Sequence, residues 1–337
     1  MFFIQLRDLY KSYGPVMALN GLNLKVPKGS LYGLLGPNGA GKSTALRIIC
    51  TLLSPDSGHV EVGGNNVLLE EKETRRRLGY VAQDVAIDKI LTGRELLQLQ
   101  GDLYHLDKKY KKKRIEELIE RLDMNEWIDR RCGSFSGGMK RRLDLASGLL
   151  HEPELLILDE PTVGLDIESR SVIWGLLKEL RNNETTILLS SHYLEEVDEL
   201  ADEMAIIDKG KVIASGKPDD LKKELGGDRV TLRVREFSDE VEAESVKKLI
   251  KNINGVSNVV VNQKQGYSLN FLVQSNDVIS NLSGHLSKEN FEVFALSHSR
   301  PSLDDVYLQA TGKTLMDAEL ELAGKRDFKL ENKKSMR

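Results

Sequence analysis

The chain has 337 residues, which is enough for one large and one small domain with a substantial buried core. A composition of 40% hydrophobic and 30% charged residues is ordinary for a globular protein, and the formal net charge of −4 offers no overall attraction to nucleic acid. The two cysteines, Cys50 and Cys132, lack metal-ligand spacing, which argues against a disulfide framework or a zinc site and fits a reducing cytosol.

Nothing in the sequence predicts that the chain enters a membrane by itself. The amino terminus becomes charged too early for a signal peptide. No run reaches the roughly 20 apolar residues that a membrane-spanning helix needs. We therefore expect any role at a membrane to require a partner.

The first 225 residues predict one α/β domain with a helical insertion. Residues 1–80 have the pattern of strands and turns around a glycine-rich loop, and residues 136–215 alternate strands with helices. Between them, residues 84–135 predict helices. Thr92 and Glu95 have the spacing of a capping box, and a second helix is predicted by four apolar residues at helical spacing. These four are Ile115, Leu118, Ile119 and Leu122.

A second domain is predicted after Gly226-Gly227, where the pattern of elements restarts. The predicted order is β-α-β-β-α-β, which is typical of a ferredoxin-like α+β domain spanning residues 226–312. Its elements are expected at Val230–Val234, Ala243–Ile253, Val256–Asn262, Tyr267–Val273, Val278–Leu286 and Glu292–Leu296. The remaining residues, 313–337, are rich in Lys and Glu and are expected to form a mobile tail. A regulatory or dimer-stabilising role for this domain and simple shielding of the first domain are equally compatible with the sequence.

The glycine-rich loop matches the phosphate-binding pattern G-x-x-x-x-G-K-[ST]. It follows the apolar run Leu31–Leu35 and precedes the helical segment Ala45–Cys50, which is the strand–loop–helix context that the motif requires. Triphosphate needs close backbone N–H groups and a helix N-terminus, and glycine permits that approach. Lys42 is expected at the β- and γ-phosphates and Ser43 on Mg²⁺. The residues of the loop are Gly36, Pro37, Asn38, Gly39, Ala40, Gly41, Lys42, Ser43 and Thr44.

Two acids end the aliphatic run Leu155–Leu158, which predicts a buried parallel strand like that expected at Thr186–Leu189. Acids at the carboxyl edge of a parallel sheet face the ligand crevice. Asp159 can therefore hold Mg²⁺ through water, and Glu160 can act as general base on the attacking water. Taken alone, the two acids are also compatible with an ordinary acidic turn.

A second anion site is predicted where Ser136, Gly137 and Gly138 precede the helical segment Lys140–Leu150. Taken alone, this triplet is compatible with a plain helix cap. Its last residue, Gly138, lies 21 positions before Asp159, however, and the triplet cannot serve the same phosphates. An anion site that has no phosphate to bind within its own subunit suggests that it binds the nucleotide of a second subunit.

Residues 4–220 resemble the ATPases of ATP-binding-cassette (ABC) transporters, because these motifs occur in the same order as in that family. The resemblance implies that Tyr13 stacks on adenine, that Gln83 touches Mg²⁺ and senses the membrane partner, and that His192 lies near the γ-phosphate. Residues 135–139 match the signature and Asp166 matches the D-loop. It further implies a RecA-like core with an antiparallel β part, and two ATPs clamped in a head-to-tail dimer. Ser136, Gly137, Gly138 and Asp166 would then act in trans.

Two segments narrow the resemblance to one branch of the family. The signature has Phe135 and Met139 where the family usually has Leu and Gln, and it is followed by basic residues. Together with Asp129–Arg131 and Pro301–Leu308, this stretch is similar to the daunorubicin-resistance ATPases of the drug-export branch.

The resemblance implies an ATPase subunit that energises export of a drug-like or lipid-like molecule. Its expected cofactors are ATP and Mg²⁺, and its expected partners are a second ATPase subunit, as a homodimer, and a separately encoded permease, with no nucleic acid. It would lie at the cytoplasmic face of the membrane. An importer ATPase and a non-transport ABC ATPase are the alternatives.

The basic run Lys108–Arg114 allows two interpretations. It is compatible with anionic lipid or nucleic acid as a partner. A solvated helix face beside Glu116, Glu117 and Glu120 is the interpretation that the sequence favours.

Overall fold

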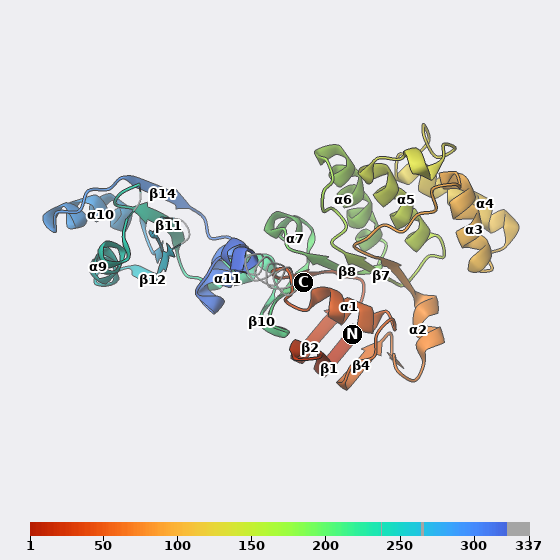
Figure 1. Ribbon diagram of the computed structural model, residues 1–337, viewed down its shortest axis with the longest axis horizontal. Coiled ribbons are helices and arrows are strands. Elements are labelled where there is room, and N and C mark those ends of the chain that lie inside the picture. Colours follow the sequence, from red (N-terminus) through yellow and green to blue (C-terminus); the bar gives the residue numbers. More distant parts are fainter. Residues whose placement is uncertain (237, 264–265, 322–337) are drawn as a thin grey trace, which may run out of the picture. The chain divides into compact units, whose positions relative to one another are not determined.

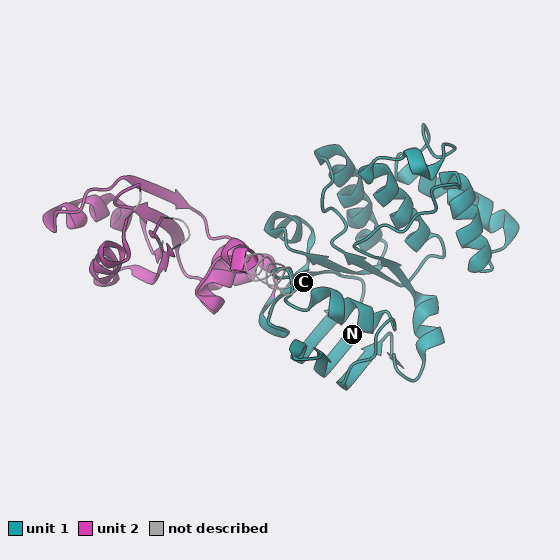
Figure 2. Cartoon of the chain, viewed as in Figure 1, with its two compact units in different colours: residues 1–215 teal, residues 216–337 magenta. Residues whose placement is uncertain are grey.

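The computed structural model describes residues 1–236, 238–263 and 266–321, and the chain divides into two compact units (Figures 1 and 2). Unit 1 spans residues 1–215 and unit 2 begins at residue 216. Across the described residues, none of the helices has the length and apolar character that a membrane span requires.

Unit 1 is built on a six-stranded sheet whose central strands run parallel. In spatial order its strands are β10 (Lys211–Gly216), β9 (Glu203–Asp208), β3 (Leu31–Leu35), β8 (Thr186–Ser191), β7 (Leu155–Asp159) and β6 (Leu78–Val81). The pairings of β6 with β7, β7 with β8, β8 with β3 and β3 with β9 are all parallel. The two buried strands predicted from aliphatic runs are β7 and β8, and every residue in both is buried.

The sheet is covered on both faces, which explains why its strands are continuous apolar runs. Leu156 and Leu158 of β7 belong to a core cluster shared with α5 (Gly137–Leu149) and α6 (Ile167–Asn182). Leu155 and Ile157 point the other way, into a cluster shared with α1 (Lys42–Ile49) and a second, antiparallel sheet (Figure 1). That sheet has the order β2 (Val16–Pro27), β1 (Phe2–Tyr13), β4 (Ser57–Val62) and β5 (Asn65–Asn66).

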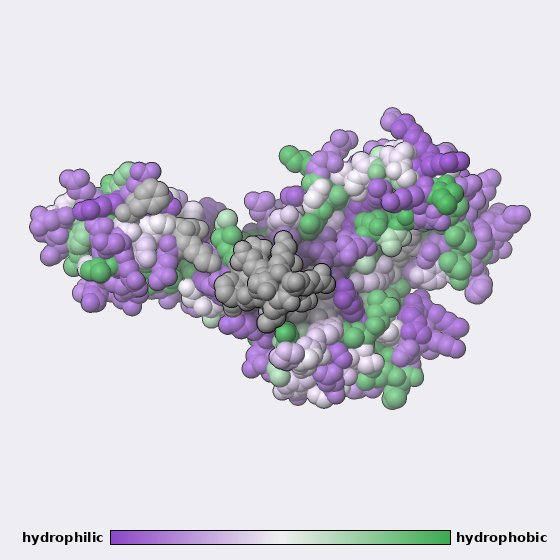
Figure 3. Space-filling model, in the orientation of Figure 1, coloured by the Kyte–Doolittle hydropathy of each residue, from purple (hydrophilic) through white to green (hydrophobic). Residues whose placement is uncertain are grey.

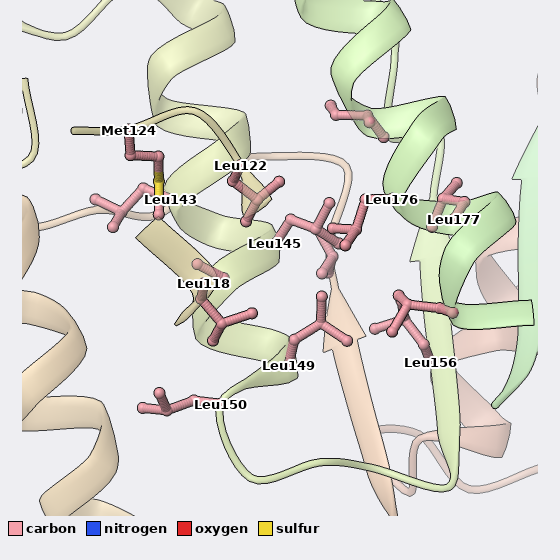
Figure 4. Packing of buried hydrophobic residues seen from close by; sticks show 14 of the residues in the cluster. Leu118, Leu122, Met124, Leu143, Leu145, Leu149, Leu150, Leu156, Leu176 and Leu177 are labelled. Carbon is pink, nitrogen blue, oxygen red and sulfur yellow. The ribbon is translucent and has the colours of Figure 1, made fainter. Parts of the chain in front are cut away.

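The predicted helical insertion lies between β6 and β7 and packs on α5. Its helices are α3 (Gly93–Leu103), α4 (Lys108–Arg121) and the short η1 (Cys132–Ser134). The capping box is confirmed, because the Thr92 side chain accepts from the Glu95 N–H while Glu95 accepts from the Thr92 N–H. Figure 4 shows Leu118 and Leu122 beside Leu145 and Leu149 of α5. Unit 1 also contains α2 (Glu71–Arg77) and α7 (Leu194–Leu200).

Unit 2 has the predicted ferredoxin-like arrangement. Its elements are α8 (Pro218–Glu224), β11 (Asp228–Arg233), α9 (Glu240–Lys251), β12 (Val256–Asn262), β13 (Ser268–Val273), α10 (Asn276–Lys288), β14 (Ala295–Ser299) and α11 (Leu303–Thr311). The sheet order is β12-β13-β11-β14, and all three pairings are antiparallel. One sheet face carries Val230, Leu232, Leu269 and Phe271 into a core shared with α9 and α10.

The last strand lies further along the chain than the sequence predicts. It was expected at Glu292–Leu296 and is found at Ala295–Ser299, where Leu296 pairs with Leu232. Phe291 and Val293, which suggested an earlier strand, pack on the core from the segment that follows α10. Their apolar pattern therefore marks the approach to the strand and not the strand itself.

The ends of unit 2 also differ from the expected boundaries. Helix α8 precedes Gly226-Gly227 yet groups with unit 2, where it packs against α11. After α11, in the segment expected to be a mobile tail, Thr314 Oγ1 donates to Asp317 Oδ2 over 2.6 Å and Leu315 is buried. The described chain therefore stays folded to residue 321, while the rest of the expected tail, residues 322–337, lies outside the described residues.

Replacing Leu118 by Ala should destabilise unit 1, because this fully buried side chain fills the contact between the insertion and α5. Truncation of a buried leucine typically costs about 2–5 kcal/mol. Leu99→Ala on α3, where the side chain is 51% exposed, is the control and should change stability by about 0.5 kcal/mol or less. Urea unfolding checks both variants, and equal effects would contradict this account of the insertion.

Candidate nucleotide-binding site

The phosphate loop joins β3 to α1 under close steric limits. Gly41 caps α1 with φ of 111°, a conformation that L side chains rarely adopt. A Cβ at Gly41 would lie 2.5 Å from the Ala18 carbonyl oxygen, and one at Gly36 would lie 2.2 Å from that of Ile207. Only glycine fits at either position. The Lys42 amine is buried and donates to the Gly36 and Pro37 carbonyls over 2.7 and 3.3 Å.

The structure brings Asp159, the last residue of β7, beside Ser43. One carboxylate oxygen, Oδ1, accepts from Ser43 Oγ over 3.2 Å and from Ser190 Oγ over 2.6 Å. The other, Oδ2, is buried and has no hydrogen-bond partner within the described parts of the chain. Because an unpartnered buried carboxylate oxygen is costly, this atom fits a cation or its bound water. A hydroxyl and a carboxylate are oxygen donors of the kind that Mg²⁺ prefers.

Glu160 is the meeting point of the predicted site residues. Its Oε1 lies 3.3 Å from Lys42 Nζ and 3.2 Å from His192 Nδ1, and its Oε2 accepts from Gln83 Nε2 over 3.2 Å. The residue is only 5% exposed. Gln83, Lys42 and His192 lie 77, 118 and 32 positions from Glu160 in the sequence. All three contact its carboxylate at the carboxyl edge of the sheet.

The backbone at Glu160 is held in an uncommon conformation. Its φ of 49° lies in the left-handed region, which costs a non-glycine residue roughly 1–2 kcal/mol. The surrounding structure enforces it, since the Glu160 N–H donates to both the carbonyl oxygen and the Oγ of Ser190 over 3.1 Å. This strain turns the side chain back toward Lys42 and His192.

Opposing effects set the charge of Glu160. Burial raises the pKa of the carboxyl, but the hydrogen bond from His192 and the charge of Lys42 together lower it by more. The net pKa of Glu160 is below its ordinary value. The side chain is therefore an anion at neutral pH, which is the form that can accept a proton.

Two residues that the sequence analysis missed support this geometry. Ser190 bonds both Asp159 and Glu160, as described above. Arg141 is buried on α5 and donates to the carbonyl oxygens of Ala82, Asp159 and Pro161. It therefore ties the residue before Gln83 to the residues on either side of Glu160. The available signal was the pair Arg141-Arg142 next to the apolar run of α5.

The second predicted anion site lies at the start of α5. Ser136 caps the helix by accepting from the Met139 N–H over 3.2 Å, and its own N–H points to the Met139 sulfur at 3.5 Å. A Cβ at Gly138 would lie 2.2 Å from Ser169 Oγ, and Ser169 in turn donates to Asp166, the cap of α6. The signature and the D-loop residue are thus packed together.

Tyr13 lies apart from these groups, at the end of β1. Its side chain is 47% exposed, and it pairs through the backbone with Val16. An exposed aromatic ring is available for stacking on a planar base. The structure shows no contact between Tyr13 and the carboxylate cluster among the described hydrogen bonds and ring contacts.

A parallel sheet, a phosphate loop before α1 and acids at the end of β7 define a nucleotide-hydrolysing α/β protein. The ABC transporter family model matches residues 19–163, and the model of the DrrA1-3-like ATP-binding protein C-terminal domain matches residues 216–311. The second match begins at residue 216, as unit 2 does, and covers its elements from α8 to α11.

Relatives of known function match along most of their length. A daunorubicin resistance ATP-binding protein of Streptomyces coeruleorubidus is 40% identical over 90% of this chain and 93% of its own. A linearmycin resistance ATP-binding protein of Bacillus subtilis is 36% identical over 93% of this chain and 100% of its own. A dimeric ATP-binding cassette in a post-hydrolysis state with ADP and Pi shares the fold with a TM-score of 0.59, at 26% identity, over 64% of this chain and 98% of that one.

The chain therefore belongs to the family of ABC transporter ATP-binding proteins, and within it to the daunorubicin-resistance type. It is an ATPase subunit whose ATP hydrolysis is coupled to transport. The resemblance expected from the motifs is confirmed, as is the cassette fold followed by an α+β domain.

The low pKa of Glu160 predicts a pH dependence of stability. In the folded chain this pKa is below that of the unfolded chain, about 4.3, so the unfolded chain takes up the proton first as pH falls. The contribution of Glu160 is therefore fully present above about pH 5 and is lost as pH falls through the folded pKa. Urea unfolding of the wild type and of Glu160→Gln should show a stability difference that falls with decreasing pH. A difference that rises instead would contradict the assigned direction.

Proposed function

We propose that two copies of this chain act with a separately encoded permease at the cytoplasmic face of a membrane and energise export of a drug-like or lipid-like molecule. The convergence of Lys42, Gln83 and His192 on Glu160 carries the proposal, because it supplies a charged base beside a phosphate loop. The relatives confer resistance to daunorubicin and to linearmycin, which supports export as the direction.

Each site residue has a role in hydrolysis that follows from its position. The N–H groups of the loop from Gly36 to Thr44 and the Lys42 amine bind the triphosphate. Glu160 would accept the proton of the attacking water, and His192, which contacts the Glu160 carboxylate, would lie near the γ-phosphate. Ser43, Asp159 and Gln83 would hold Mg²⁺, which neutralises phosphate charge when bound.

The proposed dimer completes each site with residues of the other subunit. Ser136, Gly137 and Gly138 would present the start of α5 to the partner's nucleotide, and Asp166 would lie beside them at the start of α6. No described atom lies within 4 Å of a Cβ built at Gly137, so this helix start is open. Tyr13 would stack on the adenine of its own subunit's ATP.

Replacing Glu160 by Gln should keep ATP binding and lower turnover at least a hundredfold, since positioned general bases contribute about 10²–10⁴. ATPase assays and nucleotide titration check the two effects separately, and size-exclusion chromatography should detect an ATP-trapped dimer. Glu184→Gln, at an exposed surface position, is the control and should hydrolyse ATP like the wild type. Normal turnover in Glu160→Gln would contradict the assignment of Glu160 as the general base.

Replacing Gly137 by Asp should abolish hydrolysis with little loss of nucleotide affinity in the monomer. The added carboxylate has room but repels the partner's phosphates. Gly175→Asp on α6, where a Cβ also meets open space, is the matched control and should remain active. Mixing Gly137→Asp with Lys42→Ala should restore one complete site per heterodimer. A large loss of affinity in Gly137→Asp monomers would instead place the signature in its own subunit's pocket.

A further inference from the structure

The start of helix α4 has an uncompensated positive face. Its first seven residues include six basic side chains and no acid. Two of the six are neutralised, since Lys111 pairs with Asp102 and the buried Arg114 pairs with Glu117. The other four are exposed, and the ion pairs recorded for the described residues include none of them. These four are Lys108, Lys109, Lys112 and Lys113.

The glutamates expected to balance these lysines bind other groups. Glu116 pairs with Arg94 over 2.5 Å. Glu117 pairs with Arg114 over 2.8 Å and with Arg121 over 3.3 Å. Glu120 lies two turns beyond Lys112 and Lys113. The four lysines are therefore exposed on a solvated helix face, as the sequence favoured, but none of the ion pairs among the described residues joins them to these neighbouring glutamates.

This charge arrangement opposes helix formation. The N-terminus of a helix carries a partial positive charge, so lysines in the first turns are unfavourable there. Lys108 and Lys112, and likewise Lys109 and Lys113, are spaced i,i+4 and repel each other on one face. Asp107 offsets part of this as the N-cap, accepting from the Lys109 and Tyr110 N–H groups over 2.9 and 3.1 Å. Local conflicts of this kind are expected where a function requires them.

Exposed apolar and aromatic side chains lie next to these lysines. Leu103, at the end of α3, is 65% exposed, and Tyr104 and Tyr110 are partly exposed on either side of the α3–α4 turn. Figure 1 shows α3 and α4 at the periphery of unit 1, and Figure 3 shows hydrophobic residues beside hydrophilic ones over these helices. Lysines with flanking aromatic and apolar groups are the combination found at the headgroup level of bilayers.

We propose that this basic corner, made of Leu103, Tyr104, Lys108, Lys109, Lys112 and Lys113, binds the anionic headgroups of a lipid bilayer. Charge complementarity selects an anionic partner, and the flanking apolar and aromatic side chains favour a membrane over nucleic acid. The inference rests on the proposed function, since a permease partner brings the chain to a membrane surface. Contact at this corner would orient unit 1 relative to the bilayer.

The test is sedimentation of the full chain with vesicles of phosphatidylcholine, with and without phosphatidylglycerol. The wild type should bind the anionic vesicles at low ionic strength and less at about 0.15 M salt. Changing the four lysines of the corner to Gln should lower partitioning by roughly several hundredfold, since each lysine near an anionic surface contributes roughly fivefold. The matched control changes four other exposed lysines to Gln and should bind like the wild type. These are Lys72, Lys211, Lys217 and Lys248.

Two further measurements separate this role from a structural one and from nucleic-acid binding. The corner variant should keep its ATPase activity and melt at a temperature no lower than the wild type, because its like charges at a helix start are removed. A lower melting temperature, equal losses in both lysine variants, or binding to nucleic acid without binding to vesicles would overturn the proposal. If the wild type binds the anionic vesicles but does not hydrolyse ATP, that result would count against the proposed function and not against membrane binding.

Discussion

The contacts of the Glu160 carboxylate with Lys42 and His192 depend on a constraint of parallel sheets. Strands β3, β7 and β8 run in one direction, so the segments that leave them begin at the same edge. Lys42 follows β3, Glu160 follows β7 and His192 follows β8. An antiparallel neighbour would have placed one of these residues at the opposite edge, some 15 Å away for a strand of five residues. The parallel order is therefore what allows the Glu160 carboxylate to contact the segments that follow both β3 and β8.

Helix α5 connects this edge to the helical insertion. Its apolar side packs against α4 and β7 in one core cluster, and its first turn carries the signature. From the same helix, Arg141 reaches the carbonyl oxygens of Ala82 and Pro161, and Arg114 of α4 reaches the carbonyl oxygen of Leu149. A displacement of the insertion would therefore shift α5 and, through Arg141, the backbone beside Gln83 and Glu160. This connection gives a physical route by which a contact on the insertion reaches the hydrolytic site.

The sequence predicted what depends on local pattern and spacing. The phosphate loop, the buried strands, the Thr92 capping box and the β-α-β-β-α-β order are all legible because each has a period or a cap of its own. Features that are set by tertiary contacts were not predicted. The strand at Ala295–Ser299 was placed too early, since Phe291 and Val293 are apolar for packing and not for pairing. Ser190 and Arg141 were missed because their partners lie 18 to 59 positions away.

The same limit applies to the charges of α4. The sequence predicts a solvated helix face with glutamates nearby, but it does not show which groups those glutamates contact. The structure redirects those acids, because Arg94 from α3 and Arg121 from the end of α4 take Glu116 and Glu117. The lysines are then left at the positive end of a helix whose other face is fixed by Ile115, Leu118 and Ile119 in the core. Since burial of that apolar face outweighs the repulsion, the helix can hold an unfavourable charge pattern in place for a partner of opposite sign.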